Sequence, residues 1–186
     1  MDLYKANKIS DRLIVFGEVL PPGQVNAMAL VIGDTKAALI DTGMGITGDL
    51  DTYVRQYTDL PIVVLCTHGD PDHIGACSLF ETVYMSTRDA ELLDWALSRQ
   101  QRLADLFDMS RGNEEIYQYA QAHIVDEKRF AYKNIEDGDT FDLGGVVLEA
   151  IAVPGHTKGS MCFVNRAEQY VLTGDTIVPT PWLWID

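Results

Sequence analysis

The sequence predicts a mixed α/β fold with layered sheets, and three observations support this class. Short apolar segments bounded by turn residues recur in the first part of the chain, as is typical of buried strands. A long stretch with helical periodicity follows, with leucines at 92, 93, 97, 103 and 106. Short apolar segments then return near the end. This order predicts one α/β domain over residues 1–186.

The first half of the chain contains five expected strands. They are the apolar segments at residues 12–16, 27–32, 37–40, 62–66 and, as a weaker candidate, 81–85. Residues 49–57 have helical character and lie between the third and fourth segments. A short helix is expected over residues 75–80, directly after a polar turn. These assignments place turns rich in aspartate and glycine at the ends of strands.

A helical insertion is expected at about residues 87–125. The sequence from Ser86 to Asp89 fits a capping box, in which the last side chain bonds back to the first residue. SRGN at 110–113 interrupts the helix and residues 114–125 resume it. The insertion either forms a wall over a pocket or packs as a helix pair on the flank. Strands then return at residues 139–143, 146–152, 161–164 and 170–172.

The bulk properties exclude several classes of protein. At 186 residues the chain can bury a substantial core, and its formal net charge is −14. Binding to nucleic acid depends on lysine and arginine that neutralise phosphates, so we expect neither nucleic acid nor an anionic membrane as a partner. No apolar run approaches the roughly 18–20 residues that would cross a bilayer.

Localisation is expected to be cytoplasmic. The opening sequence MDLYKANKIS lacks the basic and apolar regions of a secretory signal. Cys66, Cys77 and Cys162 are an odd number of cysteines in scattered apolar contexts. A disulfide framework is therefore not expected, and a reducing compartment is the default.

Two histidines and two aspartates are packed into the sequence HGDPDH at residues 68–73. Residues two apart project to the same side of an extended chain, so His68, Asp70 and Asp72 can converge, with His73 following at the start of a helix. Imidazole nitrogen and carboxylate oxygen are ligands for zinc, iron or manganese. The alternative, a solvated acidic turn, leaves both histidines unexplained.

Three further short motifs end or connect expected strands. His156 lies in the loop VPGHTKGS, Asp175 follows the strand in LTGDT, and Asp41 follows the strand in LIDTG. Each of these alone is a common turn. Together with HGDPDH they form a set of histidines and aspartates that follow strands, which favours a metal site over four unrelated turns.

The order DTG, HxDxDH, GHTxGS and TGD resembles the metallo-β-lactamase fold superfamily of metal-dependent hydrolases, from about residue 10 to residue 180. VPGHTKGS and LTGDT are most similar to the subgroup that contains hydroxyacylglutathione hydrolases. The resemblance implies a four-layer αββα sandwich with two metal ions at one edge of the paired sheets. It implies a small-molecule substrate and a water-dependent cleavage of an ester, thioester, lactone or similar bond.

The resemblance also implies a role for each side chain. Six side chains would bind metal: His68, Asp70, Asp72, His73, His156 and Asp175. The first metal would be held by His68, Asp70 and His156, and the second by Asp72 and His73, with Asp175 between them. Asp41 would brace the metal-binding loop. In catalysis, Asp72 or Asp175 would orient the attacking water and move its proton.

Asp70 departs from the family pattern, which has histidine at this position. Another carboxylate would make the first metal a weaker Lewis acid and would favour iron or manganese over zinc. Flavodiiron proteins resemble this arrangement, with a glutamate there. Two zinc ions are the leading expectation, and one metal or an empty site are the alternatives. The alternative functions are a diiron redox protein of the flavodiiron or persulfide dioxygenase type, or a binding module with a degenerate metal site.

The end of the sequence is the second departure. The family supplies one more histidine to the second metal, after a further strand and helix. Two alternatives are open: the sequence is cut short and lacks that last strand and helix, or the second metal is held by too few protein ligands. The remaining histidine, His123, lies in the helical insertion and matches no family ligand. Trp182 and Trp184 would cover the exposed sheet or contact a partner chain, which leaves a homo-oligomer open.

Overall fold

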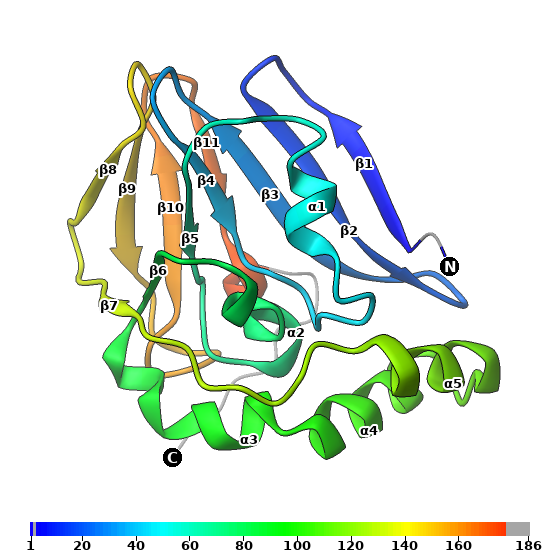
Figure 1. The fold of residues 1–186 in the computed structure, drawn as a ribbon. Helices are drawn as coiled ribbons and strands as arrows, with labels where there is room; N and C mark the ends of the chain where they lie inside the picture. The colour runs from blue at the N-terminus through cyan, green and yellow to red at the C-terminus, as the bar shows by residue number, and fades with distance from the viewer. Residues whose placement is uncertain (2, 178–186) are drawn as a thin grey trace.

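Two β-sheets pack face to face in the computed structural model, which describes residues 1 and 3–177 (Figure 1). The larger sheet has seven strands in chain order: β1 (Tyr4–Lys8), β2 (Leu13–Leu20), β3 (Gln24–Ile32), β4 (Ala37–Ile40), β5 (Ile62–Leu65), β6 (Val83–Met85) and β7 (Lys133–Asn134). The smaller sheet has the order β11 (Tyr170–Leu172), β10 (Met161–Asn165), β9 (Val147–Ala152) and β8 (Thr140–Asp142).

Helices lie on the outer side of the larger sheet and along one end of the molecule (Figure 1). They are α1 (Leu50–Val54), α2 (Pro71–Ile74), α3 (Leu93–Leu97), α4 (Arg99–Met109) and α5 (Glu114–His123). Three 3₁₀ turns, η1 (Cys77–Leu79), η2 (Thr87–Leu92) and η3 (Gly174–Thr176), connect other elements. None of the helices in the described part of the chain is long and apolar enough to span a membrane.

The central strands are buried on both faces because their two sets of alternating side chains enter different cores. On β4, Ala38 and Ile40 face the smaller sheet and pack with Phe163, whereas Leu39 faces the helices. A strand that is covered on both faces has a nearly continuous apolar sequence. Strands β4 and β5 are of this kind, and they pair in parallel. This double burial fixes where both strands end, and the loops that follow them carry the site.

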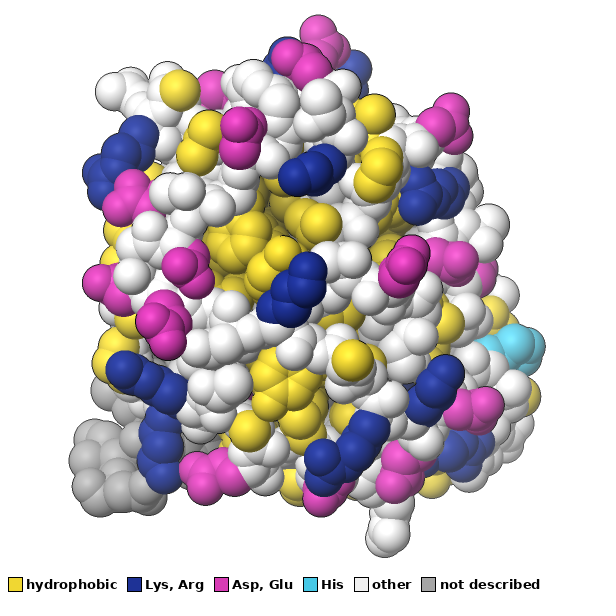
Figure 2. Space-filling model, turned by 60° about the vertical axis from the view of Figure 1, so that its left-hand side comes forward, with side chains coloured by type: hydrophobic (Ala, Val, Ile, Leu, Met, Phe, Trp, Pro, Cys, Tyr) yellow, Lys and Arg dark blue, Asp and Glu magenta, His cyan; other side chains and the backbone are white. Residues whose placement is uncertain are grey.

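The two sheets are closed by aromatic contacts at the edge formed by β6 and β8. The rings of Tyr84 and Phe141 meet edge to face with their centroids 5.1 Å apart. Figure 2 shows this side of the molecule, where hydrophobic side chains reach the surface among charged side chains of both signs. The aromatic contacts tie the edge of the small sheet to the large one.

The prediction of a mixed α/β fold with paired sheets is confirmed, with several corrections to its elements. The short helix expected over residues 75–80 is the 3₁₀ turn η1, and it is preceded by α2, which begins at Pro71, where proline fits the first turn of a helix, and ends at Ile74. The helix expected after Ser86 is broken into η2, α3 and α4. The strands β1 and β7 were missed. The expectations for Trp182, Trp184 and a missing last strand and helix lie outside the described residues.

Candidate metal centre

The site begins where the parallel strands β4 and β5 end side by side. The register pairs Ile40 with Leu65, so the loops that follow them leave the sheet together. The Asp41 carboxylate accepts hydrogen bonds from the Thr67 backbone N–H and from the Thr67 hydroxyl, both at 2.7 Å. Asp41 is 2% exposed and has a φ of 60°, a left-handed conformation that aspartate tolerates better than most residues. It ties the two loops together.

The Thr67 hydroxyl determines which nitrogen of His68 faces the site. The hydroxyl has one proton and donates it to Asp41, so its oxygen accepts from Nδ1 of His68, which lies 2.9 Å away. In the neutral form of His68, which is the form that binds a metal, Nε2 is then the nitrogen that has the lone pair. His68 is 2% exposed. A histidine fixed in this way is prepared to bind a metal through Nε2.

A first cluster of donor atoms comes from two loops distant in sequence. Nε2 of His156 lies 3.1 Å from Nε2 of His68 and 3.1 Å from Oδ2 of Asp70, and the Asp70 oxygen is 3.6 Å from His68 Nε2. His156 is carried by the loop between β9 and β10, which is joined to the first loop by a 2.7 Å bond from Met161 N–H to the Thr67 carbonyl oxygen.

The spacing of this cluster fits a bound divalent metal ion. Ligand atoms at about 2.05 Å from a tetrahedral zinc ion are separated by about 3.3 Å, which lies between the observed separations. Two imidazole nitrogens at 3.1 Å repel one another unless a proton or a cation lies between them. The donor set of two nitrogens and one carboxylate oxygen also suits iron and manganese. The residues present therefore fit one metal ion.

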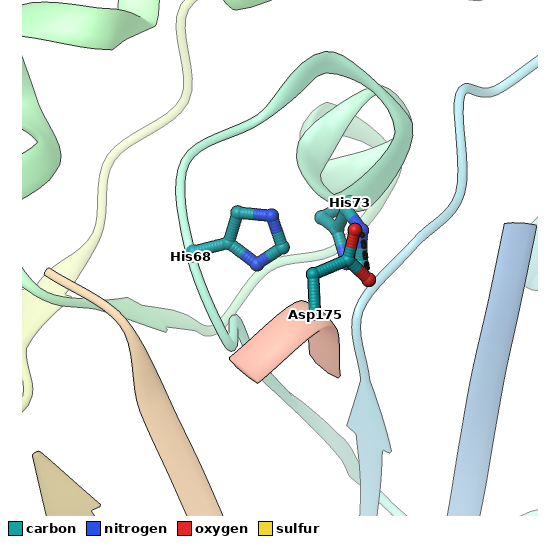
Figure 3. Close-up of side chains that lie close together, drawn as sticks. All are labelled: His68, His73 and Asp175. Carbon is teal, nitrogen blue, oxygen red and sulfur yellow. Dashed lines mark ion pairs between the residues drawn. The ribbon is translucent and has the colours of Figure 1, made fainter. Parts of the chain in front are cut away.

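A second cluster adjoins the first. Nε2 of His73 lies 3.8 Å from Oδ2 of Asp72 and 3.5 Å from Oδ1 of Asp175. Figure 3 shows Asp175 reaching from η3 toward His73, with the ring of His68 pointing into the same space. The other oxygen of Asp175 lies 4.0 Å from Nε2 of His156. Asp175 therefore stands between the two clusters, as the sequence resemblance implies for a bridging ligand.

His73 is held with Nε2 toward this second cluster because its other nitrogen is occupied. Nδ1 lies 2.8 Å from Oδ2 of Asp41 and donates a hydrogen bond to it. Burial lowers the pKa of His73, but the carboxylates of Asp72 and Asp41 outweigh burial and raise it to about 10. Near neutral pH a metal ion must displace a proton from Nε2, so metal binding here releases a proton.

The first cluster also shifts the pKa of its carboxylate. Burial of Asp70 by itself raises the pKa, but hydrogen bonds and charge from His156 and His68 outweigh burial and hold it far below its ordinary value. Asp70 is therefore a carboxylate at all ordinary pH values. It brings a full negative charge to a position at which a histidine would be neutral.

Asp89 is a functional residue that the sequence analysis missed. Its buried carboxylate accepts hydrogen bonds from Gly69 N–H at 2.9 Å, the Thr157 hydroxyl at 2.7 Å and Gly159 N–H at 2.7 Å. It thus joins the loop of His68 and Asp70 to the loop of His156. A Cβ atom on Gly159 would lie 2.6 Å from the Asp89 carboxyl carbon, so only glycine allows this approach.

The capping-box interpretation of Asp89 was half right. The Ser86 hydroxyl does accept from the N–H of Arg88, at 3.3 Å, at the start of η2. The Asp89 side chain, however, turns to the metal loops. His123 lies exposed on α5, where its ring stacks on Tyr119 with centroids 4.1 Å apart. Each of the six expected ligands lies in one of the two clusters.

Comparison with known proteins shows the family of this chain. The sequence matches the metallo-beta-lactamase superfamily over residues 20–186. An uncharacterised protein of Mycobacterium leprae is 29% identical over 161 residues, which cover 84% of this chain and 71% of the relative. A probable polyketide biosynthesis zinc-dependent hydrolase of Bacillus velezensis is 27% identical, with 76% of this chain and 50% of the relative covered.

The fold is similar to that of solved structures. A metallo-beta-lactamase family protein of Thermus thermophilus superimposes with a TM-score of 0.64 at 21% identity, covering 92% of this chain and 62% of that one. This similarity concerns the fold alone. The hydroxyacylglutathione-hydrolase subgroup stays a prediction. The family match covers nearly all of the sequence, including every histidine and aspartate of the two clusters, and the chain belongs to the metallo-beta-lactamase superfamily.

Proposed function

We propose that this chain forms the active site of a metal-dependent hydrolase that cleaves an ester, thioester, lactone or similar bond of a small molecule with water. The observation that carries the proposal is the pair of adjoining donor clusters, with Asp175 3.5 Å from His73 in one and 4.0 Å from His156 in the other. Two sites that share a carboxylate are suited to hold two metal ions close together.

The first ion would be held by His68, Asp70 and His156, and the second by Asp72 and His73, with Asp175 common to both. Metal ions bound there would polarise a substrate oxygen and lower the pKa of a water molecule. Two zinc ions are our proposal, and the extra carboxylate of Asp70 makes iron or manganese the alternative.

Asp72 and Asp175 have the exposure that the proton-transfer step requires. Their side chains are 20% and 44% exposed, whereas the histidines of the site are nearly buried. In the proposed reaction the water oxygen bonds to the carbonyl carbon as the bond to the leaving oxygen or sulfur breaks. One of the two carboxylates takes the proton from the water and delivers it to the leaving group.

The names of the relatives support hydrolysis at the level of reaction class. The Bacillus velezensis relative is named as a zinc-dependent hydrolase. A relative from Gallus gallus, 25% identical over 157 residues, is named as an acyl-coenzyme A thioesterase. This chain spans 50% and 56% of these two proteins. We therefore propose the class of bond and leave the substrate at a small molecule.

The test combines metal content with turnover. Purified protein loaded with zinc, manganese or iron is examined by elemental analysis and against a panel of esters, thioesters and lactones. H156A should lose metal and activity together, whereas H123A should keep both. For D72N and D175N we expect kcat to fall about 10²- to 10⁴-fold in protein that still holds metal. The proposal is wrong if protein that holds metal hydrolyses no member of the panel.

Asp70 gives a specific reason to test a second function, redox chemistry at a diiron site. A site with three carboxylates and three histidines is harder than the usual one of the family, and this favours iron. The redox function predicts iron in the purified protein and consumption of dioxygen with a reductant or persulfide. Zinc content together with ester turnover would reject it.

A further inference from the structure

The structure contains a cavity beside the first metal cluster, between the insertion and the loop of His156. Its volume is about 260 Å³. Asp70 and Thr157 lie at the end next to the metal ligands, and Leu92 and Trp95 form an apolar wall. From this arrangement we propose that the cavity binds the acyl part of the substrate, and that it selects uncharged, apolar acyl groups of medium length. The inference rests on the hydrolase function proposed above.

The apolar wall is not needed to build the core. Along α3, the side chains of Leu93, Ala96 and Leu97 are buried and complete the hydrophobic layer against the larger sheet. Leu92 and Trp95, three residues apart, lie on another face of the same segment. Trp95 is 40% exposed, which is unusual for so large an apolar side chain. An exposed apolar wall next to a reaction site is a binding surface.

The wall is held in a fixed position relative to the reacting atoms. Asp89, three residues before Leu92, bonds to Gly69 in one metal loop and to Thr157 and Gly159 in the other. The segment η2–α3 therefore cannot move away from the metal site without breaking buried, charge-assisted hydrogen bonds. A substrate group that contacts Trp95 is therefore held at a defined distance from a substrate carbonyl group that lies beside Asp70.

The charges around the cavity disfavour an anionic group. The lining has three carboxylates, Asp70, Asp89 and Glu91, and one ammonium group, Lys158. Nζ of Lys158 lies 3.0 Å from the Glu91 carboxylate, so its charge is already matched. A carboxylate or phosphate group on the acyl part of a substrate would meet no uncompensated positive charge among the residues that line this cavity. An uncharged hydrocarbon group has no such cost.

The cavity has room for an alkyl chain. Its volume of about 260 Å³ is many times that of a single water molecule. We expect kcat/KM to rise about two- to four-fold for each methylene added to a short acyl chain, and to stop rising once the chain extends beyond the wall formed by Leu92 and Trp95.

The experiment measures turnover and binding separately. Metal-loaded wild-type protein is assayed with p-nitrophenyl esters from acetyl to dodecanoyl, and W95A, L92A and F107A are compared. Phe107 is the matched control, since it is 39% exposed on α4 and does not line the cavity. W95A and L92A should flatten the dependence on chain length, so that longer esters lose the advantage that they have over the acetyl ester in wild type. F107A should keep the dependence.

Calorimetry supplies a measurement that does not depend on turnover. Octanoate should bind at least ten-fold more tightly than suberate, which has the same length and a second carboxylate at its far end, and W95A should remove most of this difference. Octanoate binding that depends on Trp95, with no ester cleaved, would support the cavity and reject the hydrolase. Ester cleavage with no preference for chain length in wild type, or an unchanged preference in W95A, would overturn the cavity and leave the hydrolase intact.

Discussion

Asp89 is the side chain that bonds to both loops of the first metal cluster. Its carboxyl group is buried, with the residue 1% exposed, and accepts hydrogen bonds from three donors of those loops. A residue of this kind holds metal ligands in position without binding the metal itself. Its contribution should therefore be visible in metal affinity.

We predict that D89N weakens metal binding about 10- to 100-fold. In D89N, an amide NH₂ group replaces one of the oxygen atoms that accept from a backbone N–H. Two donors then face one another, so one of the two loops must move away. Competition with a chromophoric chelator measures the dissociation constant. E91Q is the control, because the Glu91 side chain is 65% exposed on the same turn. A D89N protein that is folded and binds metal as tightly as wild type would show that Asp89 does not position the ligands.

Glu18 is a second buried carboxylate, and it holds the loop that follows Asp41. It accepts hydrogen bonds from Met44 N–H at 2.8 Å, Ile46 N–H at 2.9 Å and the Asn26 side chain at 3.1 Å. Complete burial raises its pKa above the ordinary value of 4.5, and these hydrogen bonds reduce the shift. The folded protein therefore binds this proton more tightly than the unfolded chain.

This shift predicts a pH dependence of stability. The contribution of Glu18 to the free energy of unfolding is greatest below pH 4.5 and is lost as the pH rises through its folded pKa. In urea unfolding of metal-free protein, the free energy of unfolding of wild type should therefore fall relative to that of E18Q as the pH rises. E81Q, at an exposed position, should show no such trend. If the difference in the free energy of unfolding between wild type and E18Q did not change with pH, the pKa of Glu18 would not be raised in the folded protein.

How far these residues could be predicted from sequence depended on their spacing. His68, Asp70 and Asp72 are two apart and follow a strand, a pattern that is visible in one line of sequence. Asp89 gave no such signal, since its partners lie 20 to 70 positions away and its neighbours matched a capping box. Glu18 was missed because one acidic residue in an apolar strand gives no information about its partners.

At the scale of elements, boundaries were predictable where both faces of a strand are buried. The bounds of β4, whose four residues are all buried, agree with the sequence prediction. Those of β11 also agree, although its middle residue is exposed. β1 was missed because four of its five residues are exposed, which leaves no apolar alternation. The break between α3 and α4 was missed because the leucine spacing continues across Ser98, whose extended ψ of 121° ends one helix and whose hydroxyl caps the next.

Helix α4 is joined to the site through Arg102, which is 0% exposed. Its guanidinium donates to the carbonyl oxygens of Met44 at 3.2 Å, Gly75 at 3.1 Å and Val125 at 2.7 Å. These three residues belong to the loop after β4, the end of α2 and the end of the insertion. The planar guanidinium group thus reinforces direct bonds between these segments, in which Gly43 and Gly45 accept from the N–H groups of Gly75 and Val125.

R102M should therefore lower the free energy of unfolding by about 2–4 kcal/mol, because three buried acceptors lose their donor. The measurement is urea unfolding of metal-free protein. Q100M, at an exposed position of the same helix, should change stability by less than about 0.5 kcal/mol. An R102M protein as stable as wild type would show that these carbonyl groups find other donors.

At the scale of the whole molecule, the site joins three parts of the chain that no local pattern relates. The large sheet supplies His68 and His73, while the small sheet supplies His156 and Asp175. The presence of two paired sheets could be predicted, because the motifs resemble those of a known family. A wall over a pocket was one of the two expectations for the insertion, but the residues that line the cavity could not be predicted, because they depend on how η2 and α3 turn against the loop of His156.

Because the metal ligands come from both sheets, a bound ion links the two halves of the fold. An ion that binds only the folded state adds about 2.7 kcal/mol to the free energy of unfolding at a hundred-fold excess over its dissociation constant. For a protein of this size that raises the melting temperature by about 5–10 °C. Chelation should reverse the rise, H68A and H156A should lack it, and H123A should retain it. A melting temperature that neither added metal nor chelator changes would identify a degenerate site, and the hydrolase proposal would fail with it.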